Sequence, residues 1–133
     1  MKQNYRVYFE DTDAGGIMYH ANYLKFAERG RTEALIALGI DQFHLKETRG
    51  LIFVIARIEI DYKRPAILGD MITVETTLKS MGRSSLCMEQ HLTRDSETLS
   101  LLQVTVVLID QAGKPQKLPD DIGTALQTLI KQD

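Results

Sequence analysis

Residues 21–38 read ANYLKFAERGRTEALIAL, and they set a helical periodicity that dominates the first third of the chain. Small and apolar residues recur there at steps of three and four, which is the spacing of one helix face. They are Tyr23, Ala27, Gly30, Ala34 and Leu38. A mid-helix glycine costs about 1 kcal/mol relative to alanine. We therefore expect the strip around Gly30 to let a sheet approach the helix closely, and Gly39 to end the helix.

Strand patterns lie on both sides of this helix. Residues 5–9 alternate before it, residues 51–62, 72–78, 86–92 and 99–109 follow it, and a short C-terminal helix begins near Pro119. Consecutive strands joined by short turns pair antiparallel. The order predicts an α+β fold, with one curved five-stranded sheet wrapped around one long helix. A doubly wound sheet is excluded, and a cystatin-like or nuclear-transport-factor-like sheet is the alternative, which the strand ahead of the helix disfavours.

Length and charge narrow the protein class. The 133 residues predict a single domain over 1–133. With 16 basic and 18 acidic residues, the net charge is −2, so the chain lacks the excess of positive charge that is typical of nucleic-acid-binding proteins. The longest apolar run, Leu51 to Ala56, is far shorter than the roughly 20 residues that span a bilayer. Cys87 is the only cysteine, which together with the lack of a secretory segment predicts a cytoplasmic protein.

An acidic, glycine-bearing turn from Asp11 to Gly16 precedes the helix. Gly15 and Gly16 permit a close backbone approach to a ligand, beside helix amides that lack partners. A carboxylate held there, such as Asp13, can act as a nucleophile or an acid-base group while the amides polarise a carbonyl oxygen. A solvated turn and helix cap is the alternative. A calcium loop is disfavoured because Asn22 stands where a glutamate is required.

The three histidines are far apart and form no ligand set, so no metal site is predicted. His20 differs from the other two in position, because it lies at the predicted helix entrance, seven residues after Asp13. Its side chain or its backbone amide could face the same ligand as Asp13, and a capping or core role is the alternative.

The stretch EDTDAGGIMYHANYLKFAERGRTE, residues 10–33, strongly resembles the start of hotdog-fold acyl-CoA thioesterases. It is most similar to the YbgC-like branch, which is associated with bacterial Tol-Pal gene clusters and related to 4-hydroxybenzoyl-CoA thioesterase. The segments YKRPA at 62–66 and GRSS at 82–85 look like later strands and a hairpin of the same family. The resemblance covers essentially the whole chain and implies the hotdog fold.

The resemblance implies a catalytic role for Asp13, as a nucleophile that forms a mixed anhydride or as a general base on water. It also implies that the amide of His20 polarises the thioester carbonyl, with Tyr19 adjacent; the His20 imidazole is often proposed to assist in this branch. Gly16, Ile17 and Tyr19 are the expected substrate contacts of the loop. The family commonly has a tyrosine where this chain has Phe9, so any hydroxyl role there is missing or has moved to Tyr8.

Coenzyme A carries phosphates, and no separate cofactor is implied because coenzyme A is part of the substrate. Lys63, Arg64 and Arg83 are the candidate phosphate contacts, since strand ends and hairpins in that region line the coenzyme groove of the family. A solvated surface is the alternative for each of them.

A hotdog protomer leaves a long sheet edge that favours pairing. The resemblance implies a homodimer or homotetramer with active sites at the subunit interface. The expected activity is hydrolysis of short-chain or hydroxyaryl acyl-CoA to a carboxylic acid and CoA. The alternative is a catalytically weak hotdog module that binds acyl carrier protein or a cell-envelope-associated partner, and acyl carrier protein is a possible partner in either case.

Overall fold

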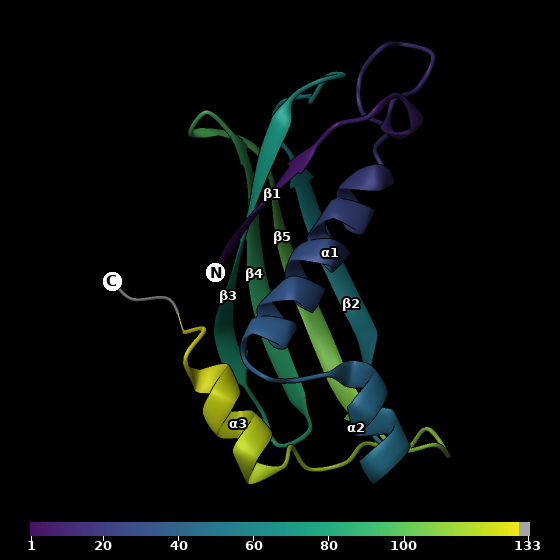
Figure 1. Cartoon of the computed structure of the whole chain (residues 1–133), viewed down its shortest axis with the longest axis vertical. Coiled ribbons are helices and arrows are strands. Elements are labelled where there is room, and N and C mark those ends of the chain that lie inside the picture. The colour runs from purple at the N-terminus through teal and green to yellow at the C-terminus, as the bar shows by residue number, and fades with distance from the viewer. Residues whose placement is uncertain (131–133) are drawn as a thin grey trace.

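The computed structural model describes residues 1–130 as one five-stranded antiparallel sheet with a long helix, α1, across one face (Figure 1). The strands are β1 (Lys2–Arg6), β2 (Ile52–Tyr62), β3 (Met71–Met81), β4 (Ser85–Arg94) and β5 (Glu97–Ile109). The helices are α1 (Asn22–Ala37), α2 (Gln42–Arg49) and α3 (Asp120–Gln127), with a short 3-10 turn, η1, over Phe9–Asp11. The strand order is β1-β3-β4-β5-β2. The α+β hotdog fold predicted from the sequence is confirmed.

The close contact expected at Gly30 is present between α1 and β3. A Cβ atom on Gly30 would lie 2.5 Å from Val74 Cγ1, so only glycine allows the helix this near to the sheet. Gln90 of β4 is fully buried below the helix, and its Nε2 donates to the carbonyl oxygen of Ala27 at 2.8 Å and to Thr76 Oγ1 at 2.9 Å. The small-residue strip therefore packs against the sheet, and a buried amide joins the two layers.

The first strand lies three residues earlier in the chain than the sequence predicted. The expected strand over residues 5–9 is wrong beyond Arg6, because β1 ends there and the chain turns into η1. The turn closes when the Asp11 carboxylate accepts a hydrogen bond from Tyr8 N at 2.8 Å. The alternation of Tyr5 and Val7 consequently does not continue to Phe9, whose side chain is 82% exposed.

Helix α2 is not among the elements predicted from the sequence, although both of its ends carry local signals. The Asp41 carboxylate caps its first turn by accepting from His44 N at 3.1 Å, and Gly50 ends it in the left-handed conformation at φ 65°. Leu45 is the buried residue of this helix. Within residues 1–130, no helix has both the length and the apolar composition needed to cross a membrane.

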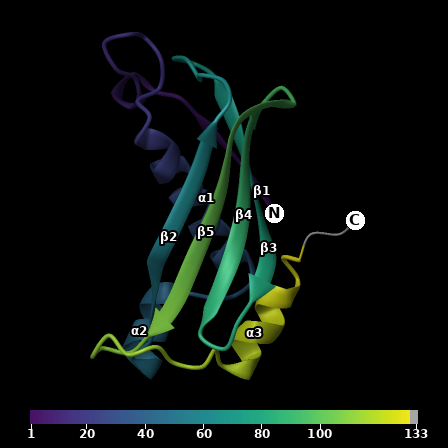
Figure 2. The same cartoon turned by 180° about the vertical axis from the view of Figure 1, so that it is seen from behind.

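Strand β2 forms one edge of the sheet and runs from the α2 end of the molecule to the start of α1 (Figure 2). Its described partner is β5, from Ile52 opposite Ile109 to Tyr62 opposite Ser100. The pairing is interrupted by a bulge between Ile55 and Arg57. The other edge of β2 is consequently open along residues 52–62 within the described chain.

Candidate active site

The loop between η1 and α1 is a tight, internally bonded turn. Thr12 and Met18 form an antiparallel bridge, and Asp13 N donates to the carbonyl oxygen of Ile17 at 2.9 Å. Gly16 N donates to the carbonyl oxygen of Asp13 at 3.0 Å, and Gly16 has φ +81°, a conformation that favours glycine. The acidic, glycine-bearing segment is therefore a fixed structure within the described chain.

The side chain of Asp13 is exposed on the outer side of this loop. Its Oδ1 accepts a hydrogen bond from Gly15 N at 2.8 Å, and Oδ2 accepts none from residues 1–130. The carboxylate and Gly16 line a hollow of about 530 Å³ whose apolar walls include Phe9 and Leu68. Asp13 thus has one oriented oxygen and one available oxygen beside an apolar surface.

Asp11 is a buried anchor of the loop that the sequence analysis did not single out. It is only 3% exposed, and besides Tyr8 N its carboxylate accepts from Asn22 Nδ2 at 3.0 Å. Its carbonyl oxygen accepts from Tyr19 N at 2.8 Å. Asp11 therefore joins η1, the end of the loop and the first residue of α1.

His20 lies at the head of α1 with an exposed side chain. Its backbone N–H donates no hydrogen bond within residues 1–130, whereas the neighbouring Tyr19 N–H is occupied by Asp11. The rings of Tyr19 and His20 lie 4.5 Å apart between centroids. His20 therefore supplies an unpaired amide donor at the helix N-terminus, and Tyr19 does not.

The last residue of β2 fixes the His20 backbone from the sheet. Tyr62 Oη donates to the carbonyl oxygen of His20 at 2.7 Å, and the Tyr62 ring packs edge-on against Tyr23 at 5.1 Å between centroids. Burial raises the pKa of Tyr62, and the nearby Tyr23 raises it further. Because its ordinary pKa is about 10, Tyr62 remains a protonated donor at neutral pH.

The structure brings together some of the predicted site residues and separates others. Ile17, His20, Lys63 and Arg64 line one groove of about 390 Å³, and Asp13 and Gly16 line the hollow described above.

Arg83 lies away from both, in a hollow of about 360 Å³ between the β3–β4 hairpin and α3. Since β4 begins beside the end of β5 that pairs with Ile52, Arg83 is at the opposite end of the sheet from His20. Within one chain, Arg83 therefore does not join Lys63 and Arg64.

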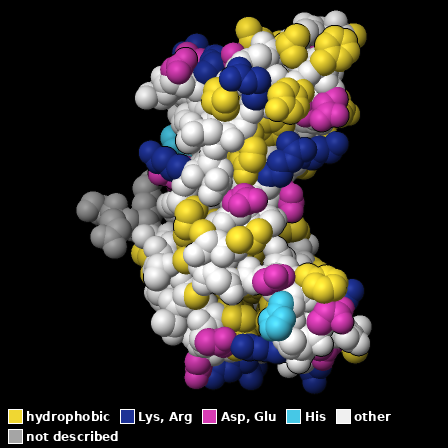
Figure 3. Space-filling view, viewed as in Figure 1, with side chains coloured by type: hydrophobic (Ala, Val, Ile, Leu, Met, Phe, Trp, Pro, Cys, Tyr) yellow, Lys and Arg dark blue, Asp and Glu magenta, His cyan; other side chains and the backbone are white. Residues whose placement is uncertain are grey.

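Cations and apolar side chains surround the loop. Arg64 lies 3.7 Å from Glu97 between Nε and Oε2, and Lys63 has no ion pair within the described residues. Figure 3 shows hydrophobic side chains gathered where α1 begins, and those exposed in this region are Tyr8, Phe9, Ile17, Tyr19, Ile67 and Leu68. Among residues 1–130, no group of three His, Cys, Asp or Glu side chains is arranged to hold a metal ion.

Comparison with known proteins identifies the family. The family model described as the thioesterase superfamily matches residues 15–101. The chain belongs to the thioesterase superfamily. It is 42% identical over 125 residues to the acyl-CoA thioesterase YbgC of Haemophilus influenzae, which covers 93% of this chain and 92% of that protein. The resemblance to YbgC-like thioesterases predicted from residues 10–33 is confirmed.

Two further relatives support the same assignment. The 1,4-dihydroxy-2-naphthoyl-CoA hydrolase of Synechococcus elongatus is 31% identical over 121 residues, or 90% of this chain and 89% of that protein. The crystal structure of a probable thioesterase from Bartonella henselae superposes with a TM-score of 0.86 at 36% identity, covering 90% of this chain and 98% of that chain. The thioesterase described here is thus an acyl-CoA thioester hydrolase.

Proposed function

We propose that this thioesterase hydrolyses short-chain or hydroxyaryl acyl-CoA, with Asp13 as the reacting carboxylate and the His20 amide as the oxyanion donor. One observation carries the proposal. Hydrogen bonds from Asp13 N, Gly15 N, Gly16 N and Tyr19 N fix the loop. Asp13 Oδ2 has no partner in the described chain, and neither does the N–H of His20, which is an unpaired amide at the head of α1. Unpaired donors aimed at a site stabilise the negative charge that develops on a thioester oxygen during attack.

Two routes are open to Asp13. As a nucleophile, its carboxylate attacks the thioester carbon, the tetrahedral oxyanion collapses, CoA leaves as the thiolate, and water hydrolyses the mixed anhydride. As a general base, it takes a proton from the water that attacks the same carbon. Turnover in ¹⁸O-labelled water distinguishes the two. Label in the Asp13 carboxylate after turnover supports the nucleophilic route, because a general base does not exchange its oxygens.

The substitution Asp13→Asn tests the assignment, with Glu10→Gln as a matched control. Glu10 is an exposed carboxylate of the same segment. We expect Asp13→Asn to lower kcat/KM by about a thousandfold with an unchanged melting temperature, and Glu10→Gln to remain active. The assay is thiol release across a panel of acyl chain lengths and hydroxyaryl thioesters. Wild-type turnover in purified Asp13→Asn protein would refute the role of Asp13.

The open edge of β2 supports a site shared between two copies of the chain. Strand β2 presents half-buried and exposed apolar residues along this edge, including Phe53 and Ile55. Exposed edge strands of this kind are templates for pairing. Antiparallel pairing of two β2 strands about their middle would set the His20 groove of one copy beside the Phe53 end of the other. We therefore propose a homodimer with this pairing as the catalytic unit, whether or not it assembles further.

The same pairing bears on the phosphate contacts. Lys63 and Arg64 adjoin the His20 groove, and Arg83 lies at the opposite end of the sheet. In the proposed dimer, Arg83 of one chain is therefore at the same end as Lys63 and Arg64 of the other. We expect single substitutions of these three cations by methionine to raise KM for acyl-CoA more than they lower kcat. A KM unchanged in all three variants would refute the assignment.

A further inference from the structure

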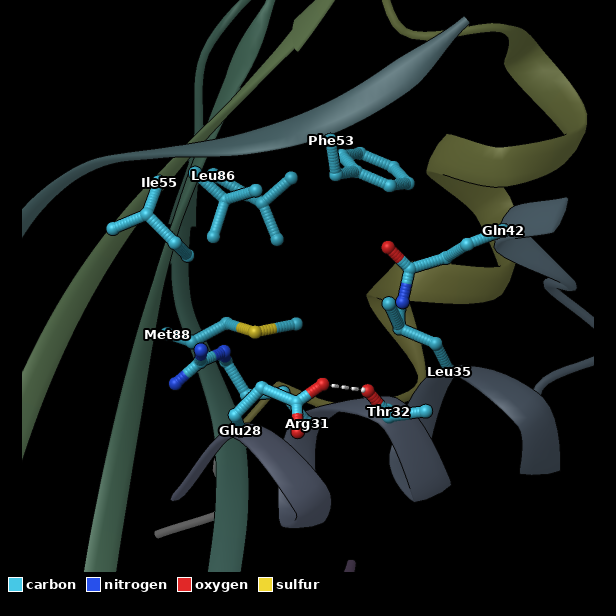
Figure 4. Close-up of a pocket in the computed structure, with 10 residues that line it drawn as sticks. Glu28, Arg31, Thr32, Leu35, Gln42, Phe53, Ile55, Leu86 and Met88 are labelled. Atoms are coloured by element: carbon cyan, nitrogen blue, oxygen red, sulfur yellow. Dashed lines mark hydrogen bonds between the residues drawn. The ribbon is translucent and has the colours of Figure 1, made fainter. Parts of the chain in front are cut away.

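A further cavity lies between α1, the start of α2 and the inner face of the sheet, and Figure 4 shows the side chains that line it. Its volume is about 180 Å³. The apolar walls are Leu35, Phe53, Ile55, Leu86, Met88 and Val106. Glu28, Arg31 and Thr32 border it from α1, and Gln42 from α2. This cavity shares no residue with the loop or with the His20 groove.

Arg31 places a buried positive charge at this cavity. The residue is 9% exposed, and its NH1 group donates to Gln90 Oε1 at 3.0 Å. Gln90 is uncharged, and no carboxylate within residues 1–130 forms an ion pair with Arg31. Glu28 borders the same cavity, but it is exposed and its Oε1 accepts from Thr32 Oγ1 at 2.8 Å.

A buried guanidinium that has no ion pair favours the binding of an anion. Buried charges are costly unless they are paired, and arginine carries five N–H donors of which Gln90 uses only part. The planar donor fork of arginine matches a carboxylate, which it binds through two parallel hydrogen bonds. Burial lowers the pKa of Arg31 and the charge of Glu28 raises it, but arginine remains protonated at neutral pH.

The volume limits the size of the ligand. An apolar protein cavity of about 150 Å³ binds benzene, so a cavity of about 180 Å³ suits a chain of about four to six carbons. We propose that this cavity is the acyl subsite and that Arg31 selects short acyl groups with a carboxylate at the far end, that is, CoA monothioesters of dicarboxylic acids. This inference rests on the proposed function, which it narrows to one substrate class.

The proposed dimer supplies the route to the cavity. Arg31 is eleven residues after His20, or about 16 Å along the helix axis at 1.5 Å per residue. That separation is too long for a short acyl group held at the same chain's loop. Phe53 and Ile55, which wall the cavity, belong to the half of β2 that would face the other copy's His20 groove. The thioester would lie on the loop of one chain and its acyl group in the cavity of the other.

The test compares matched acyl pairs in three proteins. Succinyl-, glutaryl- and adipyl-CoA are each compared with butyryl-, pentanoyl- and hexanoyl-CoA, with the uncatalysed rates subtracted. The variants are Arg31→Met and a matched control, Arg29→Met, because Arg29 is exposed on the same helix. The readout is the ratio of kcat/KM for the dicarboxylic and monocarboxylic members of each pair, which general loss of folded protein does not change.

We expect the wild type to prefer the dicarboxylic member of at least one pair by about tenfold or more. Arg31→Met should abolish that preference by lowering kcat/KM mainly for the dicarboxylic members, and Arg29→Met should retain it. Arg31→Lys keeps the positive charge but lacks the planar donor fork of the guanidinium, so it should retain part of the preference. This variant replaces Arg31→Met in the test if Arg31→Met does not fold.

Three results would overturn the inference. The first is a wild type with no dicarboxylic preference, and the second is an Arg31→Met variant that loses both members of each pair equally. The third is dissociation of Arg31→Met into monomers in sedimentation with the acyl preference unchanged, which would assign Arg31 to the subunit contact. In the first two cases the proposed function stands if wild-type hydrolysis persists.

If the wild type hydrolyses none of the thioesters, the proposed function fails and titration calorimetry with glutarate decides the cavity alone. Binding to the wild type that is lost in Arg31→Met supports the carboxylate site. Equal binding to both proteins, or binding to neither, overturns it.

Discussion

Two regions of the protein differ in whether their polar atoms have hydrogen-bond partners. They are the loop over residues 12–20 and the contact of α1 with the sheet at Gly30. Below the helix, the Gln90 amide is fully buried and bonded to Ala27, Thr76 and Arg31. In the loop, Asp13 and His20 each keep a polar atom that no described residue satisfies. The first region holds the fold together, whereas the second is open to a ligand. Asp11, the last residue of η1, combines features of both regions, because it is buried like Gln90 and its carbonyl oxygen accepts a hydrogen bond from the loop residue Tyr19.

The largest expected effect comes from Asp11. Asp11→Ala removes a buried carboxylate that accepts from Tyr8 N and Asn22 Nδ2, and leaves both donors without a partner. We expect the free energy of unfolding to fall by about 3 kcal/mol, whereas Asp13→Ala should change it by about 0.5 kcal/mol or less because Asp13 is exposed. Denaturant unfolding measures both. Equal losses in the two variants would contradict the division between anchor and reacting carboxylate.

Gly30→Ala tests the packed region. The new methyl group would lie 2.5 Å from Val74 Cγ1, so the helix or the strand must move. We expect a loss of about 2 kcal/mol in unfolding free energy from this overpacking. Gly123→Ala in α3 is the matched control, because nothing lies within 4 Å of its added Cβ, and it should raise stability by up to about 1 kcal/mol. The double variant Gly30→Ala, Val74→Ala should recover part of the loss.

The same contrast explains what the sequence alone could predict. The helix could be predicted because its apolar periodicity over residues 21–38 is local in sequence. Gly30 indicated a close contact with the sheet, because a glycine within a helix lowers its stability without such a contact. Asp13 and His20 could be nominated from a motif. The burial of Asp11 could not, because adjacent carboxylates look alike until the folded chain buries one of them. The separation of Arg83 from His20 follows from strand order, which is set by contacts far apart in sequence.

Asp70 extends the comparison to pH, because it anchors the segment that bridges the loop at Ile67 and Ile17. Burial raises the pKa of Asp70, but hydrogen bonds from Ile67 N and the Arg94 guanidinium outweigh it, so the pKa lies below its usual range. A lowered folded-state pKa stabilises the protein above the unfolded value of about 4, and that contribution is lost as the pH falls through the folded pKa.

The free energy of unfolding of the wild type and of Asp70→Asn, measured between pH 7 and pH 3, checks the direction of this pH dependence. We expect the wild type to be more stable by about 1 kcal/mol at pH 7, after allowance for solvent screening, and the difference to shrink below about pH 4. Asp61→Asn, at an exposed carboxylate of β2, is the control and should give no such trend. A difference that grows as the pH falls would contradict the assigned direction.

The smallest expected effect belongs to Tyr62, which joins the sheet to the loop because it ends β2 and donates to the carbonyl oxygen of His20 at 2.7 Å. Tyr62→Phe keeps the ring packed against Tyr23 and removes only that hydrogen bond. Stability should fall by about 1 kcal/mol or less, since the hydroxyl is near solvent. The variant no longer fixes the carbonyl oxygen of His20, so the His20 backbone is held less firmly. If His20 N–H is the oxyanion donor, kcat should fall about threefold to tenfold with little change in KM. A change confined to KM would show that Tyr62 lines the substrate groove without orienting the donor amide.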